Sequence, residues 1–331
     1  MTSSSKSASR IPVTILTGFL GSGKTTLLNK ILQSQHTKKI AVIENEFGEV
    51  GVDNEIVLAT NGEQIVQMNN GCICCNVRGD LVPMLMQLRA QSNETLGSIE
   101  HVIIETTGLA DPAPVAQTFF IDNDVAQNYR LDSIITIVDA KHAHTQLDDF
   151  IEAQEQIGYA DRILISKSDL VDSKHYETLR KRLIKINPRA SLTNVNFGET
   201  SIDDLISIKG FSLNSILELE PDFLKEEEHE HEDTVQSFVF QTVKQIDQDK
   251  LQKFFSTIIE LNSHNLMRYK GIVSFEEFDY KVIIQGVHMI MGSDVGPLWK
   301  SNEVRESKLV FIGRNLPREE MIRSLEDCLI S

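Results

Sequence analysis

The sequence predicts an α/β fold, in which a domain with a mainly parallel sheet precedes a smaller α+β domain. Two observations carry this prediction. Short apolar runs rich in β-branched residues alternate with helix-like segments over roughly the first 200 residues, which is typical of a parallel sheet covered by helices. Beyond residue 215 the pattern changes, and the chain of 331 residues is long enough for two domains.

The first part of the chain contains apolar runs that predict strands. They are PVTILT (12–17), KIAVIE (39–44), HVIIE (101–105), SIITIVD (133–139) and RILIS (162–166). The stretch KTTLLNKILQ (24–33) follows the first run after a glycine-rich loop and has the apolar spacing of a helix. Strands that alternate with helices in this way predict a sheet with helices on both faces.

The last third of the chain predicts a more antiparallel sheet. Its strand-like runs are SFVFQTV (237–243), IVSFEEF (272–278), YKVIIQGV (280–287) and LVFIG (309–313), and its helix-like segments are 247–261 and 317–329. An acidic stretch with a proline precedes them and predicts a solvated linker. We therefore divide the chain into a disordered tail (1–10), a first domain (11–218), an acidic linker with histidines (219–233) and a C-terminal domain (234–331).

Charge and composition exclude several classes of function. The formal net charge is −16, so the long-range field repels phosphates and we expect no nucleic-acid partner. No apolar run approaches the ~20 residues that span a bilayer, and residues 1–10 lack the apolar segment of a secretory signal. We therefore expect a cytoplasmic protein without a membrane partner. In that compartment clustered cysteines favour metal or redox chemistry over disulfides.

The residues GFLGSGKT, Gly18 to Thr25, match the phosphate-binding motif G-x-x-x-x-G-K-[ST] between a predicted strand and a predicted helix. In such a loop the backbone N–H groups surround the phosphates, Lys24 supplies positive charge to the β and γ oxygens, and the Thr25 hydroxyl ligates Mg²⁺. A glycine-rich turn without a ligand is the alternative. The predicted nucleotide contacts here are Gly18, Phe19, Leu20, Gly21, Ser22, Gly23, Lys24, Thr25 and Thr26.

The segment HVIIETTGLADP supplies a carboxylate at the end of an apolar strand, as a Walker-B-like element requires. Glu105 is predicted to hold the water shell of Mg²⁺ or to polarise the attacking water, which makes it a catalytic candidate with Lys24 and Thr25. Gly108 is placed where a backbone can approach the γ phosphate. The alternative for Glu105 is a solvated acid at a strand end.

The segment RILISKSDL resembles the N-K-x-D motif that reads guanine, with Ser166 in place of the usual asparagine. Asp169 would accept hydrogen bonds from guanine N1 and N2, which adenine does not offer, while the stem of Lys167 covers the base. Such a site rejects adenine because the wrong base leaves a buried carboxylate unpaired. The predicted nucleotide is therefore GTP, and Ser166 is the position at which the segment departs from the guanine motif.

Three of the four cysteines lie in NGCICC: Cys72, Cys74 and Cys75. Thiolates favour Zn²⁺, Cu(I) or iron–sulfur chemistry, and a structural zinc site normally takes four protein ligands. Three thiolates with one open position suit a site that exchanges metal. Glu44 and Glu49 are oxygen donors that could join it, or residues of a solvated loop. Cys72 and Cys75 as a redox C-x-x-C pair are the rival interpretation.

His229 and His231 lie in the acidic run EEEHEHED, where imidazoles and carboxylates alternate. Residues at this spacing can form a weak metal-binding site. A hydrated linker is the other interpretation.

In this order and at these intervals, GFLGSGKTTLL, ENEFGE, NGCICC, ETTGLADP and SKSD resemble the CobW family of metal-associated GTPases of the zinc chaperone type, most of all its bacterial YjiA branch. The resemblance implies a SIMIBI-type P-loop G domain with slow intrinsic GTP hydrolysis. It also implies a site for Zn²⁺, or for Co²⁺ or Ni²⁺, at Cys72, Cys74 and Cys75, with Glu44 and Glu49 at metal sites. Nucleotide contacts are further implied for Asn76, Val77 and Arg78.

The resemblance implies a chaperone that delivers metal to an unidentified client metalloprotein, with GTP, GDP and the metal ion as its other partners. Many GTPases carry a nucleotide-sensitive switch segment after the second strand, where ENEFGE lies. We therefore expect GTP hydrolysis and metal affinity to be coupled. A passive metal buffer and a regulatory GTPase modulated by metal stay open as alternatives, and an oligomer is possible.

Overall fold

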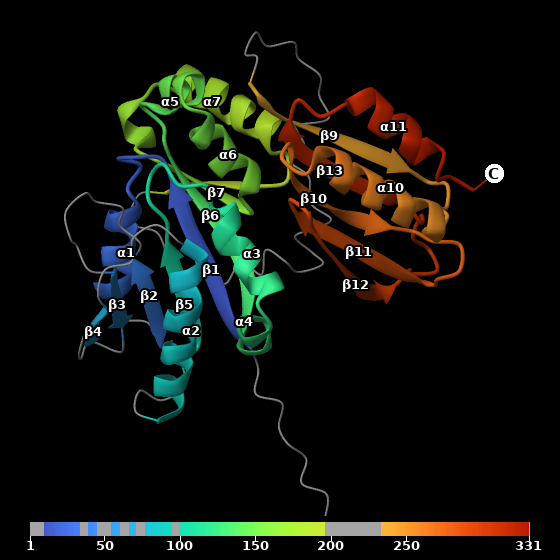
Figure 1. Ribbon diagram of the computed structural model, residues 1–331. Helices are drawn as coiled ribbons and strands as arrows, with labels where there is room; N and C mark the ends of the chain where they lie inside the picture. The colour runs from blue at the N-terminus through green and yellow to red at the C-terminus, as the bar shows by residue number, and fades with distance from the viewer. Residues whose placement is uncertain are drawn as a thin grey trace, which may run out of the picture.

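The computed structural model places two lobes side by side, one for the first domain and one for the C-terminal domain (Figure 1). The residues that the structure describes are 10–33, 39–44, 54–59, 66–70, 77–94, 99–195 and 233–330. In this part of the chain no helix has the length and apolar character needed to cross a membrane. The predicted domain limits at 218 and 219 lie outside these ranges, so these limits stay predictions.

The first domain is built on an eight-stranded sheet with the order β4-β3-β2-β5-β1-β6-β7-β8. The strands from β2 to β8 in this order run parallel, and β3 and β4 extend the edge as an antiparallel hairpin. The predicted mainly parallel sheet is confirmed, whereas β3, β4 and β8 were not predicted. The strands are β1 (Ile11–Gly18), β2 (Ile40–Glu44), β3 (Asn54–Ala59), β4 (Val66–Asn70), β5 (His101–Glu105), β6 (Tyr129–Asp139), β7 (Arg162–Ser166) and β8 (Ser191–Val195).

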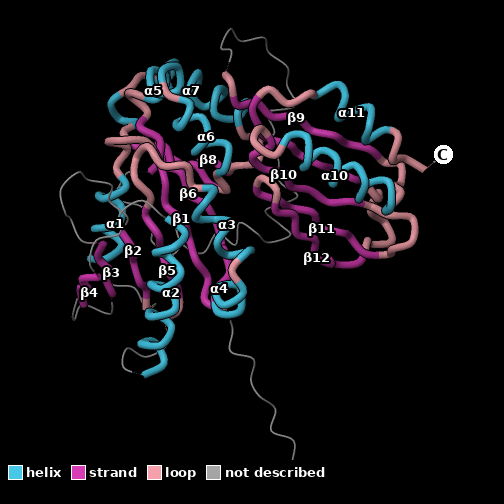
Figure 2. The backbone as a smooth tube through the Cα atoms, in the orientation of Figure 1, coloured by secondary structure: helices cyan, strands magenta, loops and turns pink. Residues whose placement is uncertain are grey.

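Helices cover both faces of this sheet because the strands bury apolar side chains on both sides (Figure 2). Leu27, Leu28 and Ile31 of α1 pack on one face, and residues of α2, α3, α6 and α7 pack on the other. The helices are α1 (Lys24–Gln33), α2 (Val77–Glu94), α3 (Ala113–Ile121), α4 (Asn123–Asn128), α5 (Ala143–Asp149), α6 (Ile151–Tyr159) and α7 (Ser173–Ile186), with the 3-10 helix η1 (Ser168–Leu170) before α7.

The C-terminal domain is an antiparallel five-stranded sheet with the order β12-β11-β10-β13-β9, and it confirms the predicted α+β class. Stacked aromatic rings, including Phe255, Tyr269 and Phe311, fill its core beneath α10 and α11. Its elements are β9 (Val235–Thr242), α10 (Gln248–Asn262), β10 (Leu266–Val273), β11 (Tyr280–Val287), β12 (Ile290–Leu298), β13 (Ser307–Arg314) and α11 (Arg318–Glu326).

Two strands of this domain differ from the prediction. The run 272–278 is not a strand of its own, because Ile272 and Val273 complete β10 and the chain then turns toward β11. Strand β12 was missed because it is largely exposed at the edge of the sheet and lacks a continuous apolar run.

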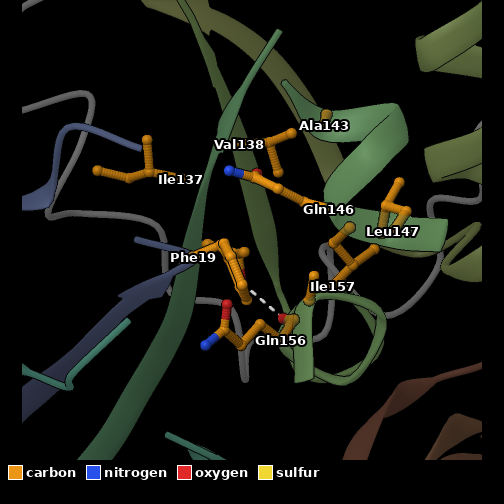
Figure 3. Close-up of a pocket in the computed structure, with 10 residues that line it drawn as sticks. Phe19, Ile137, Val138, Ala143, Gln146, Leu147, Gln156 and Ile157 are labelled. Carbon is orange, nitrogen blue, oxygen red and sulfur yellow. Dashed lines mark hydrogen bonds between the residues drawn. The ribbon is translucent and has the colours of Figure 1, made fainter. Parts of the chain in front are cut away.

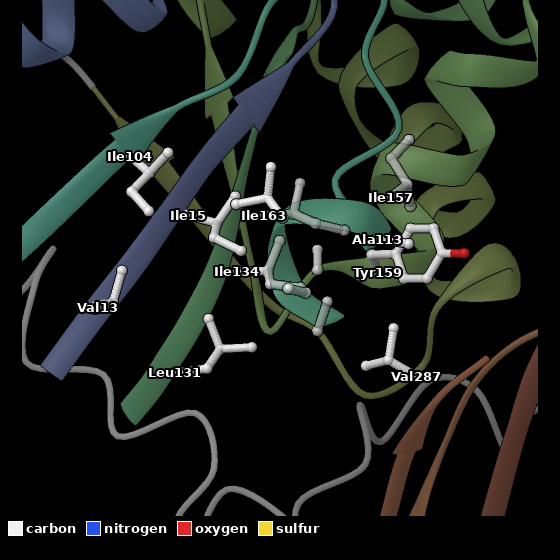
Figure 4. Packing of buried hydrophobic residues seen from close by; sticks show 14 of the residues in the cluster. Val13, Ile15, Ile104, Ala113, Leu131, Ile134, Ile157, Tyr159, Ile163 and Val287 are labelled. Atoms are coloured by element: carbon white, nitrogen blue, oxygen red, sulfur yellow. The ribbon is translucent and has the colours of Figure 1, made fainter. Parts of the chain in front are cut away.

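One apolar core continues from the first domain into the C-terminal domain (Figure 4). Ile157 and Tyr159 of α6 belong to the same buried cluster as Met267, Val287 and Ile312 of the second sheet. Gly158 allows this approach, since a Cβ there would lie 2.8 Å from Cε of Met267. The C-terminal domain is therefore packed directly against α6.

Candidate nucleotide and metal site

The carboxyl ends of the parallel strands bring the predicted site residues to one edge of the sheet. Glu105 at the end of β5 is in register with Leu16 of β1 on one side and with Glu44 of β2 on the other. Gly18 ends β1, and Ser166 ends β7 next to Asp139 at the end of β6. Ligands of open α/β sheets bind at this edge, so the topology supports a common site.

The phosphate loop has a backbone that only glycine permits at its first position. Gly18 has φ 141°, and a Cβ there would lie 2.3 Å from the carbonyl oxygen of Ile137. The side chain of Phe19 turns inward and packs against the ring of Phe150, with 4.8 Å between ring centroids. Thr25 and Thr26 are exposed in the first turn of α1. The loop thus leaves helix N–H groups and two hydroxyls open to a phosphate.

Lys24 lies inside this loop. Its Nζ donates to the carbonyl oxygens of Gly18 at 2.7 Å and of Phe19 at 3.3 Å, and the residue is buried. Burial lowers the pKa of Lys24, and the negative charge of Glu105 opposes that change. The structure therefore brings together the cation and the strand-end carboxylate that the sequence singled out.

Gly108 lies directly against the phosphate loop. A Cβ at this position would lie 2.8 Å from the backbone nitrogen of Leu20, so only glycine fits. Thr106, two residues earlier, donates from its backbone N–H to Leu16 O at 2.9 Å and from its hydroxyl to Thr17 Oγ1 at 2.8 Å. The loop that follows Glu105 is therefore joined to β1 and to the phosphate loop.

The segment 166–169 also contacts the phosphate loop. The Ser166 hydroxyl is fully buried and donates to Ser22 O at 2.7 Å. Lys167, with a left-handed φ of 55°, reaches over the loop and donates to Gly21 O at 2.9 Å. Asp169 is exposed on η1, which leaves its carboxylate accessible to a base.

Asp139 is a residue of this site that the sequence reasoning missed. Its Oδ2 accepts from Lys167 Nζ at 2.7 Å and lies 2.9 Å from Nδ1 of His142. Burial raises the pKa of Asp139, but the hydrogen bonds from Lys167 and His142 outweigh burial and hold the pKa below its usual value. Its place at the end of the apolar run SIITIVD was the available signal, as for Glu105.

A small cavity of about 10 Å³ lies behind Phe19, bordered by α5 and α6 (Figure 3). This volume holds no ligand larger than a water molecule. The cavity beside Phe19 is therefore too small to be the predicted nucleotide site.

Most predicted metal ligands lie outside the described residues. Those residues are Cys72, Cys74, Cys75, Glu49, His229 and His231, and the predicted nucleotide contact Asn76 lies outside as well. Glu44, Val77 and Arg78 are placed by their backbone alone, at the end of β2 and the start of α2. Within the described ranges no group of three or more His, Cys, Asp or Glu residues is arranged to hold a metal ion.

Comparison with known families matches both domains. The profile described as CobW/HypB/UreG, nucleotide-binding domain, matches residues 12–194, and that of the cobalamin synthesis protein cobW C-terminal domain matches residues 235–329. Together these two profiles cover both lobes of the structure.

Similar proteins match over nearly the whole chain. The zinc chaperone YjiA of Escherichia coli is 38% identical over 94% of this chain and 96% of its own length. The zinc chaperone CobW of a Sinorhizobium species is 28% identical over 100% of both chains. The crystal structure of Zn(II)-bound YjiA GTPase from E. coli superimposes with a TM-score of 0.80 over 97% of this chain and 100% of that one, at 34% identity.

Proposed function

Because this chain belongs to the CobW/HypB/UreG family, we propose that it is a GTP-binding and GTP-hydrolysing metallochaperone that carries zinc. The observation that carries the proposal is that Lys24 lies inside the phosphate loop, while Lys167 and the Gly108 loop contact the same loop from other parts of the fold. The names of the relatives, zinc chaperone and zinc-regulated GTPase, support zinc as the cargo. We further propose that the chain delivers this metal to a client metalloprotein.

The residues of the phosphate edge have separate roles in the proposed hydrolysis. Water attacks the γ phosphorus, the bond to the β–γ bridging oxygen breaks, and GDP and phosphate leave. Lys24 neutralises charge on the β and γ oxygens, Thr25 ligates Mg²⁺, and Glu105 orients the attacking water or the water shell of the metal. Mg²⁺, held by Thr25, would supply positive charge that offsets the charge developing on the phosphate oxygens.

Base recognition is proposed for Asp169, with Lys167 covering the base. The buried Ser166 hydroxyl holds the end of β7 to the phosphate loop, so this serine acts on the loop and leaves the selection of guanine to Asp169. The accessible carboxylate of Asp169 supports this role because guanine N1–H and N2–H are both donors.

We predict that Asp169→Asn changes the base preference from guanine to xanthine. The amide of asparagine donates where the carboxylate accepted, and xanthine carries a carbonyl where guanine carries its 2-amino group. Affinities for GDP and xanthosine diphosphate, measured by competition, should shift in opposite directions by ~100-fold or more, since hydrogen bonds to charged groups are worth ~1.5–3 kcal/mol each. The exposed Asp149→Asn is the matched control. Unchanged GDP affinity would remove Asp169 from the base site.

The chain order supports a connection between the cysteine motif and the nucleotide. Cys72, Cys74 and Cys75 lie between β4, which ends at Asn70, and α2, which begins at Val77. Strand β4 belongs to the same sheet as β2, where Glu44 is in register with Glu105. We propose that the thiolates hold zinc, with Glu44 and Glu49 as oxygen donors, and that hydrolysis changes the affinity of this site.

This proposal predicts that zinc affinity depends on the bound nucleotide. A competitive zinc titration of the chain in its apo, GDP and non-hydrolysable GTP forms should show a shift of ~10-fold, which corresponds to ~1.4 kcal/mol of coupling. The triple variant with serine at positions 72, 74 and 75 should lose both the tight site and the shift. By linkage, zinc must change nucleotide affinity by the same factor.

Equal zinc affinities in all three states would contradict the proposed coupling and would favour the passive metal buffer. GTP turnover that a partner protein stimulates, with no metal transferred, would favour the regulatory GTPase.

A further inference from the structure

We infer that Gln156 of α6 is a positioning residue for the nucleotide reaction, and that through it α6 links the Gly108 loop to the C-terminal domain. This inference rests on the proposed GTPase activity. It adds that α6 transmits the state of the bound nucleotide to the C-terminal domain.

Gln156 is the contact between α6 and the Gly108 loop. Its side chain is buried, and Nε2 donates to Gly108 O and to Ala110 O, both at 3.1 Å. Because both acceptors are carbonyls, the amide nitrogen must face the loop. Its own backbone carbonyl accepts from Thr136 Oγ1 at 2.6 Å, which ties this turn of α6 to β6. Gln156 thus holds two peptide units of the loop at a defined distance from the sheet.

The Gly108 loop has little other freedom on its nucleotide side. Gly108 has no room for a Cβ against the backbone of Leu20. At the far end of the loop, Asp111 accepts from the N–H of Ala113 at 2.8 Å and anchors the start of α3. A change in the loop that accompanies γ-phosphate binding would therefore strain or move the two hydrogen bonds to Gln156.

Neighbouring residues of α6 face the C-terminal domain. Glu155 forms an ion pair with Arg314 of β13, and the Tyr159 hydroxyl is hydrogen-bonded to the ring of His288. Gln154 accepts at Oε1 from the N–H of Val235 at 2.9 Å. These contacts lie within five residues of Gln156 on a single helix, so a displacement of α6 moves both the loop contact and the domain contact.

Asp111, at the end of the loop, is also in the electrostatic field of two residues of that domain. Burial raises the pKa of Asp111, while His288 and Arg314 oppose that rise by electrostatic attraction. The same two residues bind α6 through Tyr159 and Glu155. His288 has a left-handed φ of 51°, in the turn between β11 and β12, so the contact depends on the local backbone of the C-terminal domain.

The first test is Gln156→Met in the full-length chain. Methionine keeps the length and volume of the side chain but removes the amide donors. We expect kcat for GTP hydrolysis to fall by ~10-fold or more, since misplacement of a group at the reacting phosphate is costly. Affinity for GDP, which lacks the γ phosphate, should stay within about a factor of three. Phosphate release and fluorescent-GDP titration measure the two quantities.

Gln146→Met is the matched control, because Gln146 lies on α5 and borders the same small cavity as Gln156 (Figure 3). It should leave both quantities unchanged. If Gln156→Met lowers GDP affinity and thermal stability together with kcat, the residue has only a structural role and the inference is wrong. An unchanged kcat overturns it equally.

The second test measures amide hydrogen exchange in the C-terminal domain. It requires that the chain binds nucleotide, but not that it hydrolyses GTP. Amide hydrogen exchange over residues 266–290 should differ between the GDP form and the non-hydrolysable GTP form of the wild-type chain, and the difference should vanish in Gln156→Met. Equal exchange in the two wild-type forms would overturn the link. A chain that binds GTP without hydrolysing it would contradict the proposed GTPase, yet this exchange comparison would still decide the link.

Discussion

Replacing Lys24 with alanine is expected to abolish tight binding of GTP and GDP. Lys24 is the one residue of the phosphate loop whose ammonium group reaches the loop carbonyls, and it is held there by hydrogen bonds to Gly18 O and Phe19 O. Hydrogen bonds to charged groups contribute ~1.5–3 kcal/mol each, so loss of two phosphate contacts should weaken affinity by ~100-fold or more. Equilibrium titration with a fluorescent, non-hydrolysable GTP analogue measures this loss, and the loss for GDP should be smaller because GDP lacks the γ phosphate.

Lys30→Ala is the control for the Lys24 experiment. Lys30 lies on the same helix, α1, in its last turn and away from the phosphate loop. This variant should bind nucleotide as the wild type does. If Lys24→Ala also bound the GTP analogue with unchanged affinity, the phosphate loop would not be the nucleotide site, and the proposed GTPase would lose its main support.

The largest expected effect on stability belongs to Asp161, in the loop between α6 and β7. Its carboxylate is ion-paired with Arg268 and, at 3.3 Å, with Lys270, both on β10 of the C-terminal domain. All three side chains are at most 6% exposed. Burial raises the pKa of Asp161, but Arg268 and Lys270 outweigh burial and the pKa is lowered. The carboxylate is therefore ionised, and it is the counter-charge for the buried Arg268. Burial lowers the pKa of Lys270 to about 7, so Lys270 is only partly charged at neutral pH.

We expect Asp161→Asn to destabilise the chain by ~3–5 kcal/mol, the usual cost of leaving buried charge uncompensated. The midpoint of thermal unfolding should fall by at least ~4 °C. The control is Asp149→Asn, because Asp149 is exposed, and this variant should leave the midpoint of thermal unfolding unchanged. Adding Lys270→Met to Asp161→Asn should restore part of the loss, because it removes a buried amine that has lost its carboxylate partner.

The wild-type contribution of Asp161 also has a defined pH dependence. Because the pKa is lower in the folded state than in the unfolded state, the contribution is fully present above the ordinary carboxyl pKa. It is lost as pH falls through the folded-state value. A thermal midpoint for Asp161→Asn equal to that of the wild type at neutral pH would show that the interface does not depend on this ion pair.

Local patterns in the sequence determined the class of both domains and one edge of the site. Each strand predicted in the first domain is present, because a strand buried on both faces needs a continuous apolar run, and β5 and β7 have the predicted bounds. The phosphate-binding motif was equally recognisable, since wrapping a phosphate requires glycines, a lysine and a hydroxyl at set spacing. Glu105 was singled out because its carboxylate ends an apolar run, and its role stays a prediction.

Only the tertiary structure decided how these parts are connected. Strands β4 and β12 carry no continuous apolar run, so their strand structure depends on pairing with β3 and β11, the strands that precede them in the chain. Gln156, Asp139 and Asp161 look ordinary in the sequence. Their roles come from contacts with the Gly108 loop, with Lys167 and with Arg268, each more than 25 residues away. A local sequence pattern gives the type and spacing of residues. Burial and long-range hydrogen bonds are formed only when the chain folds, so a local pattern does not predict them.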